Sequence, residues 1–167
     1  DSPTDISLSA LSVDENTIGA TIGTITSEDV DSSSATYALS GTDASFFEIT
    51  ANGELKLKEG VSLDFEAKNS LDVTVTATDS DGATFSKTFS ISVTDLNDAP
   101  TSISIASLLF DENSAGANLG AINVIDEDLS GGNYTFIITG ADKDSFEIVN
   151  GELKLKDTVS ADYETKD

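Results

Sequence analysis

The chain has 167 residues and a formal net charge of −23, from 8 lysine and arginine residues against 31 aspartate and glutamate residues. A polyanion of this kind disfavours nucleic acid and anionic membrane surfaces as partners and favours divalent cations. The absence of cysteine excludes disulfides, zinc–thiolate centres and thiol nucleophiles. No apolar run approaches the ~18 residues of a membrane span, so no direct membrane insertion is expected.

The first part of the chain predicts short β-strands separated by polar turns. Threonine, serine and valine dominate, and apolar residues alternate with polar ones, as in residues 71–77, where Leu71, Val73, Val75 and Ala77 share one face. Residues 27–34, rich in serine and acidic side chains, predict a loop. Seven strands are expected, over residues 6–14, 20–25, 37–39, 46–49, 55–57, 71–77 and 85–93.

A second copy of this pattern follows an acidic hinge at residues 95–100. Asp14-Glu15-Asn16 recurs as Asp111-Glu112-Asn113 at an offset of 97 residues, and the Asn-Gly-Glu of residues 52–54 recurs at residues 150–152, at an offset of 98. A fixed period of this size indicates tandem domains, each as long as a seven-stranded sandwich of ~100 residues. We therefore predict an all-β protein of two immunoglobulin-like Greek-key β-sandwiches, repeat 1 at residues 1–98 and repeat 2 at residues 99–167.

Repeat 2 stops before the counterpart of residues 70–95, the segment that holds the last two strands of repeat 1. Residues 1–4 match residues 98–101, so the chain begins part-way through an earlier hinge. We expect an excerpt of a longer array. The alternative is that strands of another chain or a partner complete repeat 2, since a sandwich lacking two strands exposes sheet edges.

Acidic residues can converge at the hinge from both repeats. Calcium takes six to eight oxygen ligands, mostly carboxylates and backbone carbonyls. Two carboxylates about 5 Å apart repel by roughly 3 kcal/mol at an effective dielectric of ~20, so such a hinge requires cations. The candidates, with Asn97 as a further oxygen donor, are Glu15, Asp64, Glu66, Asp95, Asp98, Asp126 and Asp128.

These motifs, in this order, resemble the calcium-binding motifs of cadherin repeats. They are Asp14-Glu15-Asn16, the Leu-Asp-Phe-Glu of residues 63–66, the Asp-Ser-Asp-Gly of residues 79–82, the hinge at residues 95–100 and Asp126-Glu127-Asp128. The Asn-Asp-Ala-Pro-Thr ending at residues 97–101 is similar to cadherin-like repeats of large bacterial surface and secreted proteins. The resemblance implies two or three calcium ions at the hinge, which stiffen the array.

The resemblance also implies a ligand set. The ions nearer repeat 1 would take Glu15, Asp64, Glu66 and Asp98, and the middle ion would take Asp95, the Leu96 carbonyl and Asp128. The third would take Asn97, the Ala99 carbonyl, Asp126, Asp128 and a carbonyl from residues 131–133, but it lacks a counterpart of Asp79. Half-sites for flanking repeats would be Asp29, Asp31 and Asp79 on one side, and Glu112, Asp162 and Glu164 on the other.

The sequence thus favours a calcium-rigidified extracellular segment of a bacterial adhesin or surface filament, and not an enzyme, because neither a nucleophile–base pair nor a phosphate loop is found. Partners would be neighbouring repeats in the same or another chain, a homophilic protein or a cell-surface glycan. Two alternatives stay open. A carbohydrate-binding or spacer module of a secreted glycan-active enzyme would present Tyr37, Tyr134 or Tyr163 on a flat exposed face. A subunit completed by strand donation would account for the short repeat 2.

Overall fold

The computed structural model describes residues 1–31, 34–128 and 133–164. The chain divides into two compact units, Asp1–Leu96 (unit 1) and Asn97–Asp167 (unit 2). Apart from two single-turn 3-10 helices, every regular element of the described residues is a β-strand. This confirms the all-β prediction. The repeat bounds inferred from the sequence, 1–98 and 99–167, stay a prediction.

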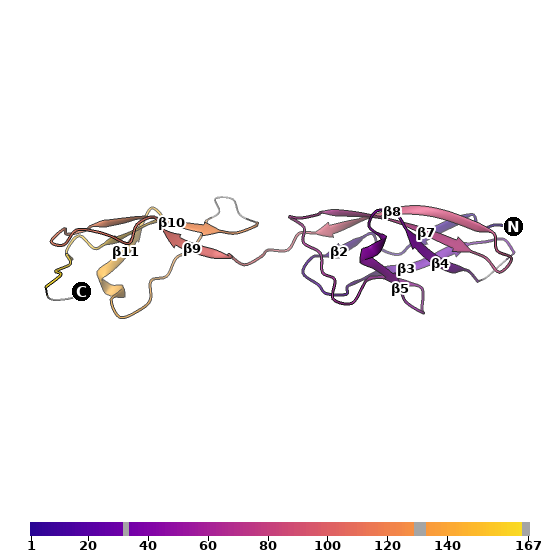
Figure 1. Cartoon of the computed structure of the whole chain (residues 1–167), viewed down its shortest axis with the longest axis horizontal. Coiled ribbons are helices and arrows are strands. Elements are labelled where there is room, and N and C mark those ends of the chain that lie inside the picture. Colours follow the sequence, from indigo (N-terminus) through magenta and orange to yellow (C-terminus); the bar gives the residue numbers. More distant parts are fainter. Residues whose placement is uncertain (32–33, 129–132, 165–167) are drawn as a thin grey trace. The chain divides into compact units, whose positions relative to one another are not determined.

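Unit 1 is a complete sandwich of two four-stranded sheets (Figure 1). One sheet has the order β1 (Asp5–Leu8), β3 (Thr21–Glu28), β6 (Glu54–Leu57), β5 (Phe47–Ile49). The other has the order β2 (Ser12–Asp14), β8 (Thr84–Thr94), β7 (Ser70–Thr78), β4 (Thr36–Ser40). Neighbouring strands are antiparallel except β2 and β8, which run parallel, with Val13 opposite Val93.

The structure corrects two details of the strand prediction. Residues 6–14, expected as one strand, form β1 and β2, which belong to different sheets. The chain crosses between the sheets over Gly23, where a Cβ atom would lie 2.7 Å from Ser9 Oγ and 2.9 Å from the Ala10 nitrogen, so only glycine leaves room. The loop expected at residues 27–34 also starts late, because β3 continues to Glu28.

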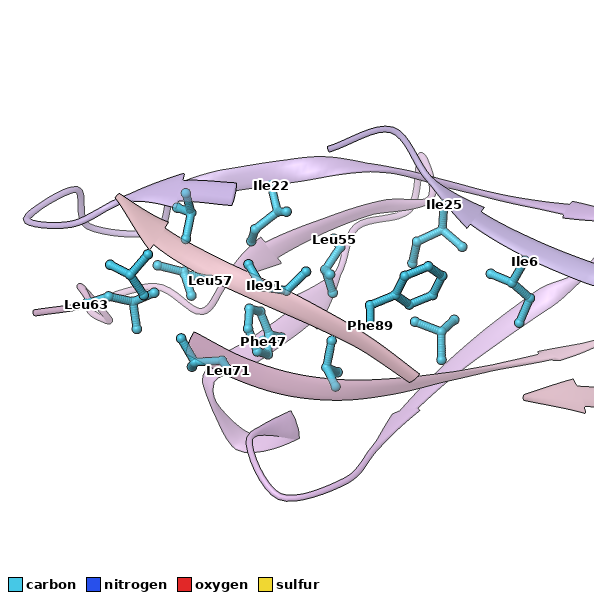
Figure 2. Close-up of a cluster of buried hydrophobic side chains, with 14 of the residues drawn as sticks. Ile6, Ile22, Ile25, Phe47, Leu55, Leu57, Leu63, Leu71, Phe89 and Ile91 are labelled. Atoms are coloured by element: carbon cyan, nitrogen blue, oxygen red, sulfur yellow. The ribbon is translucent and has the colours of Figure 1, made fainter. Parts of the chain in front are cut away.

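The core of unit 1 lies between its two sheets, and its side chains point toward one another in Figure 2. The alternation read from the sequence places the inward residues: Leu71, Val73, Val75 and Ala77 of β7 are each at most 1% exposed. Phe47, at 2% exposure, packs from the opposite sheet. Burying a side chain of the size of leucine, valine or phenylalanine contributes about 1.5–3 kcal/mol, so this cluster supplies most of the stability of unit 1.

A buried carboxylate ties the 3-10 turn η1 (Ala44–Phe46) to β7. Asp43, 5% exposed, pairs through Oδ1 with the Lys68 ammonium and accepts through Oδ2 a hydrogen bond of 2.8 Å from the Asp72 backbone N–H. The Lys68 hydrogen bond, followed by that of Asp72, holds the pKa of Asp43 below its ordinary value. The turn is therefore fixed by charge as well as by packing.

We expect Asp43→Ala to destabilise unit 1 by about 1–3 kcal/mol at pH 7, because the Asp72 N–H loses its acceptor inside the protein. The folded-state pKa of Asp43 is depressed, so its contribution is complete above the ordinary carboxyl pKa and is lost as the pH falls through the folded value. Urea unfolding of both proteins between pH 7 and pH 2 measures this. The matched control is Asp142→Ala at the same position of unit 2, which is exposed. Equal losses for the two variants would contradict the role of Asp43.

The described residues of unit 2 form one sheet. Its strand order is β11 (Phe146–Val149), β12 (Glu152–Leu155), β10 (Asn118–Ile125), β9 (Ser102–Ile105). The 3-10 turn η2 (Lys143–Ser145) comes directly before β11 in the sequence. This sheet repeats β5-β6-β3-β1 of unit 1, including a break in register at Gly120 that matches the one at Gly23. The described residues of unit 2 form no second sheet, in agreement with the prediction that repeat 2 lacks its last two strands.

Candidate metal centre

The most buried acidic group of unit 1 lies directly after β2. Glu15 is 0% exposed, and its Oε2 accepts a hydrogen bond of 2.7 Å from the Phe65 N–H, while its Oε1 accepts one of 2.8 Å from the Leu96 N–H. Carboxylate oxygens of Glu15, Asp64 and Glu66 lie within 4.8 Å of one another. Two chain segments distant in sequence therefore bring three negative charges to one end of the sandwich.

The backbone around Glu15 explains why it faces inward. The Glu15 N–H donates to the Thr94 carbonyl at 3.2 Å, and the next N–H, that of Asn16, donates to the Leu63 carbonyl at 3.0 Å. Asn16 has a φ of 58°, a left-handed conformation that asparagine tolerates better than most residues. The turn after β2 thereby joins β8 to the segment carrying Asp64 and Glu66.

Unit 2 repeats the same arrangement. Glu112 Oε2 accepts a hydrogen bond of 3.2 Å from the Tyr163 N–H, and oxygens of Glu112, Asp162 and Glu164 lie within 4.8 Å of one another. Asn113 has a φ of 57°, as Asn16 does. These three carboxylates are exposed. The predicted half-site residues are therefore brought together by the same local fold.

The Asp-x-Asp motifs also adopt one geometry in both units. The Asp31 N–H donates to Asp29 Oδ1 at 3.1 Å, and the Asp128 N–H donates to Asp126 Oδ1 at 3.2 Å. In unit 2 the Asp98 N–H donates to Asp128 Oδ2. Asp128 Oδ1 is buried and accepts no hydrogen bond within the described part of the chain. A buried anionic oxygen of this kind is costly without a positive partner.

At the first motif, the N-terminal amine takes the place that the Asp98 N–H has at the second. It donates to Asp31 Oδ2 at 2.6 Å. That hydrogen bond, together with the negative charges of Asp31, Asp29 and Asp79, raises the pKa of the amine. Asp79 is 8% exposed and its Oδ1 accepts hydrogen bonds from the backbone N–H groups of Asp81 and Ala83. The charges of all three predicted half-site residues, Asp29, Asp31 and Asp79, therefore act at the same place.

The pKa of Tyr134 is affected by the negative charges of the second Asp-x-Asp motif, Asp126 and Asp128. Burial of its hydroxyl and the negative charge of Asp126, to which it is hydrogen-bonded, raise the pKa of Tyr134, and the charge of Asp128 adds to this. The sequence analysis assigned Tyr134 only one possible role, as an exposed aromatic ring that binds carbohydrate. Its ring instead lies tilted beside Phe136, with ring centroids 6.2 Å apart, while Tyr37 is half-buried against the core of unit 1.

The remaining predicted ligands follow β8 in sequence. Leu96 donates its N–H to Glu15, a role that the sequence did not indicate because every residue has the same amide. Asn97 donates from its side chain to the Asp98 carbonyl at 2.7 Å, which leaves its amide oxygen for another donor or for a cation. Residues 131 and 132 of the predicted carbonyl loop lie outside the described residues. Whether the ligands of the two units share ions stays a prediction.

The donor set fits calcium. Carboxylates and backbone carbonyls are hard oxygen ligands, and the chain has no histidine or cysteine to favour zinc. Glu15 forms no ion pair with a lysine of the described residues, and the exposed carboxylates of Asp64 and Glu66 lie beside it, so a cation from solution would suit the buried Glu15 charge. No described helix is long and apolar enough to span a membrane.

Fold and acidic clusters together define an immunoglobulin-like repeat with groups of carboxylates that could hold a metal ion. The sequence profile of the cadherin domain matches residues 9–94, slightly more than half of the chain, and the chain belongs to the cadherin domain family. Domains of this family are extracellular, adhesion-type repeats that typically bind calcium between successive copies. No curated protein sequence matches the chain.

Solved cadherin structures share the fold. A crystal structure of domains EC1-2 of human protocadherin-24 has 24% identity and a TM-score of 0.67, covering 98% of this chain and 81% of that one. Its second crystal form has 26% identity and a TM-score of 0.67, with 95% and 78% covered. Domains EC22-24 of mouse cadherin-23 have 19% identity and a TM-score of 0.60, with 95% and 53% covered.

Proposed function

We propose that this chain is a calcium-rigidified segment of an extracellular repeat protein with a structural or adhesive role. The observation that carries the proposal is the fully buried Glu15 carboxylate, which two backbone N–H groups hold beside Asp64 and Glu66 and which forms no ion pair with a lysine of the described residues. An apolar residue would serve better at this position if its only role were packing.

The ligands would act in two groups. Glu15, Asp64 and Glu66 present their oxygens at the end of unit 1, and Asp126 and Asp128 present theirs in unit 2. Residues 95–99 join the groups and add Asp95, Asp98, Asn97 and the carbonyls of Leu96 and Ala99. Bound calcium would supply the positive charge that cancels the repulsion among these carboxylates. Two or three ions would then hold the linker in one conformation.

The mechanism is a stiffening switch set by the calcium concentration. Extracellular calcium modules commonly have Kd values of about 10⁻⁴–10⁻³ M, so such sites would fill outside a cell and empty at cytosolic calcium. At 10–100 times Kd each site stabilises the bound state by about 1.4–2.7 kcal/mol. Filling the sites would convert a flexible string of sandwiches into a rod.

The Asn-Asp-Ala-Pro-Thr of residues 97–101 supports a place in a bacterial surface or secreted protein. Neighbouring repeats would be the first partners, and adhesion through homophilic contacts or surface glycans would follow from an extended array. A strongly anionic surface would keep such chains apart where calcium is low. The proposal assigns no catalytic role to the clustered acidic groups. They would accept hydrogen bonds from backbone N–H groups and bind calcium.

Calcium titration by calorimetry tests the ligand assignment. We expect two or three ions per chain, and at least a tenfold weaker affinity for one of them in Asp128→Asn, because the buried Oδ1 is lost as an anionic ligand. The matched control is Asp144→Asn in η2, an exposed carboxylate outside every cluster described here, which should bind as the wild type does. Absence of binding at millimolar calcium would refute the proposed function.

A further inference from the structure

We propose that Asp43 is a positioning residue of the calcium site, because it keeps the ammonium group of Lys68 away from the carboxylate ligands of unit 1. Asp43 binds no ion itself and acts only through Lys68. The inference rests on the proposed function of the cluster formed by Glu15, Asp64 and Glu66, and it adds a residue outside that cluster.

Lys68 belongs to the same chain turn as two of the proposed ligands. It follows Glu66 by two residues, and its N–H donates to the Asp64 carbonyl at 2.9 Å, the hydrogen bond of one α-helical turn. Asp64 Oδ1 closes the start of this turn by accepting a hydrogen bond of 2.8 Å from the Ala67 N–H. Side chains four residues apart on such a turn are neighbours, and an acidic residue followed by a lysine at this spacing forms an ion pair. Local geometry therefore offers Lys68 to the Asp64 carboxylate.

The fold of unit 1 directs the Lys68 ammonium to Asp43, with which it forms an ion pair through Oδ1. Asp43 is fixed in place by Asp72, because its N–H donates to the Asp72 carbonyl at 3.2 Å and its Oδ2 accepts from the Asp72 N–H at 2.8 Å. The side chain of Lys68 is 47% exposed and that of Asp43 only 7%. A long and flexible cationic side chain is thus held by a rigid acceptor on another segment.

A lysine released from Asp43 would weaken calcium binding in two ways. Its ammonium would pair with the Asp64 carboxylate, four residues before it, and so occupy a ligand oxygen. Its charge would also repel the ion. An ammonium about 8 Å from a doubly charged ion, at the dielectric constant of water, raises the Kd about fivefold. The ion pair with Asp43 removes both effects.

Both partners of this ion pair recur in the sequence of repeat 2. Asp142 precedes η2 as Asp43 precedes η1, and Lys166 completes an Asp-x-Glu-x-Lys motif at the same spacing as Lys68. Lys166 lies outside the described residues. The two residues between the three charged ones differ from repeat to repeat, with Phe and Ala in the first and Tyr and Thr in the second. This recurrence fits an aspartate and a lysine that act together.

The test measures the calcium affinity of unit 1 in the full chain, from the NMR shifts of the backbone amides of Phe65 and Leu96 that bond to Glu15. Asp43→Asn removes the charge but keeps an oxygen that can accept from the Asp72 N–H. We expect this variant to raise the Kd at least about fivefold at low salt. In 1 M NaCl the ratio of the two Kd values should fall below about twofold, because the charge of Lys68 is then screened.

Removing the lysine as well separates positioning from a structural role. The double variant Asp43→Asn/Lys68→Met should return the Kd to within about twofold of the wild-type value, although it lacks the same ion pair. A structural role would leave the double variant at least as weak as the single one. The matched control is Asp5→Asn, which removes one negative charge and breaks the 2.7 Å ion pair with Lys87. This control should change the Kd by less than about twofold.

The outcomes distinguish the inference from the proposed function. Equal Kd values for the wild type and Asp43→Asn would overturn the inference and leave the calcium function intact, and so would a double variant that binds as weakly as the single one. Absence of calcium binding by the wild type would overturn both. If Asp43→Asn does not fold in chelator, as measured by urea unfolding, Asp43→Ser gives the same comparison, since serine also offers an uncharged oxygen.

Discussion

Replacing Glu15 by glutamine should abolish the stabilisation of unit 1 by calcium. For the wild type, the free energy of unfolding measured in calcium should exceed that in chelator by about 1.4–2.7 kcal/mol for each site filled to 10–100 times Kd. Glutamine removes the charge that neighbours Asp64 and Glu66, and its amide N–H₂ faces backbone N–H groups that need an acceptor. We expect the calcium increment to fall below about 0.5 kcal/mol, within the usual range of surface substitutions.

Urea unfolding in calcium and in chelator, followed by hydrogen exchange of the β7 amides, measures this increment. Glu112→Gln is the matched control, since Glu112 has the same position in unit 2 and an exposed cluster of its own. This control should leave the increment of unit 1 unchanged. An undiminished increment in Glu15→Gln would mean that calcium binds elsewhere.

Ile6→Ala should cost unit 1 about 2–5 kcal/mol, the usual range for truncation of a buried isoleucine. The same change at Ile103 should alter the stability of unit 2 by no more than about 0.5 kcal/mol. The two residues have the same side chain and the same place in the repeat, but one is 0% and the other 65% exposed. Their comparison isolates the effect of side-chain burial at one position of the repeat.

Denaturant-dependent hydrogen exchange of β3 and β10 reports the two units separately. If Ile6→Ala does not fold, the conservative variants Ile6→Val and Ile103→Val give the same comparison. Ile6→Val should then lower the free energy of unfolding of unit 1 by about 0.5–1.5 kcal/mol. Equal losses at the two positions would show that the face of unit 2 is covered in solution, contrary to the structure.

Much of unit 1 follows from local pattern. Alternation in residues 71–77 predicts both the strand β7 and its inward side chains, because a strand turns every second residue to the same face. The division of residues 6–14 into β1 and β2 cannot be read in this way. An alternating pattern fits either sheet, and the switch is set by pairing with β8 and by the close crossing at Gly23.

The acidic clusters were predictable from their recurrence in phase with the repeat, and the structure places Glu15, Asp64 and Glu66 together. The backbone N–H groups of Phe65 and Leu96 that hold Glu15 were not predictable, since amides are common to all residues and only the fold selects them. The hydrogen bond of Tyr134 to Asp126 likewise depends on how two loops meet. The assignment of ligands to individual ions rests on family resemblance and stays a prediction.

The most direct test of calcium rigidification is small-angle X-ray scattering from this chain in millimolar calcium and in chelator. We predict that calcium narrows the distribution of distances and increases the maximum dimension, as the hinge at residues 95–100 stiffens. Asp128→Asn should reduce the change, and Asp144→Asn should not. Superimposable profiles in calcium and in chelator, at concentrations where calorimetry shows the sites filled, would contradict the stiffening mechanism.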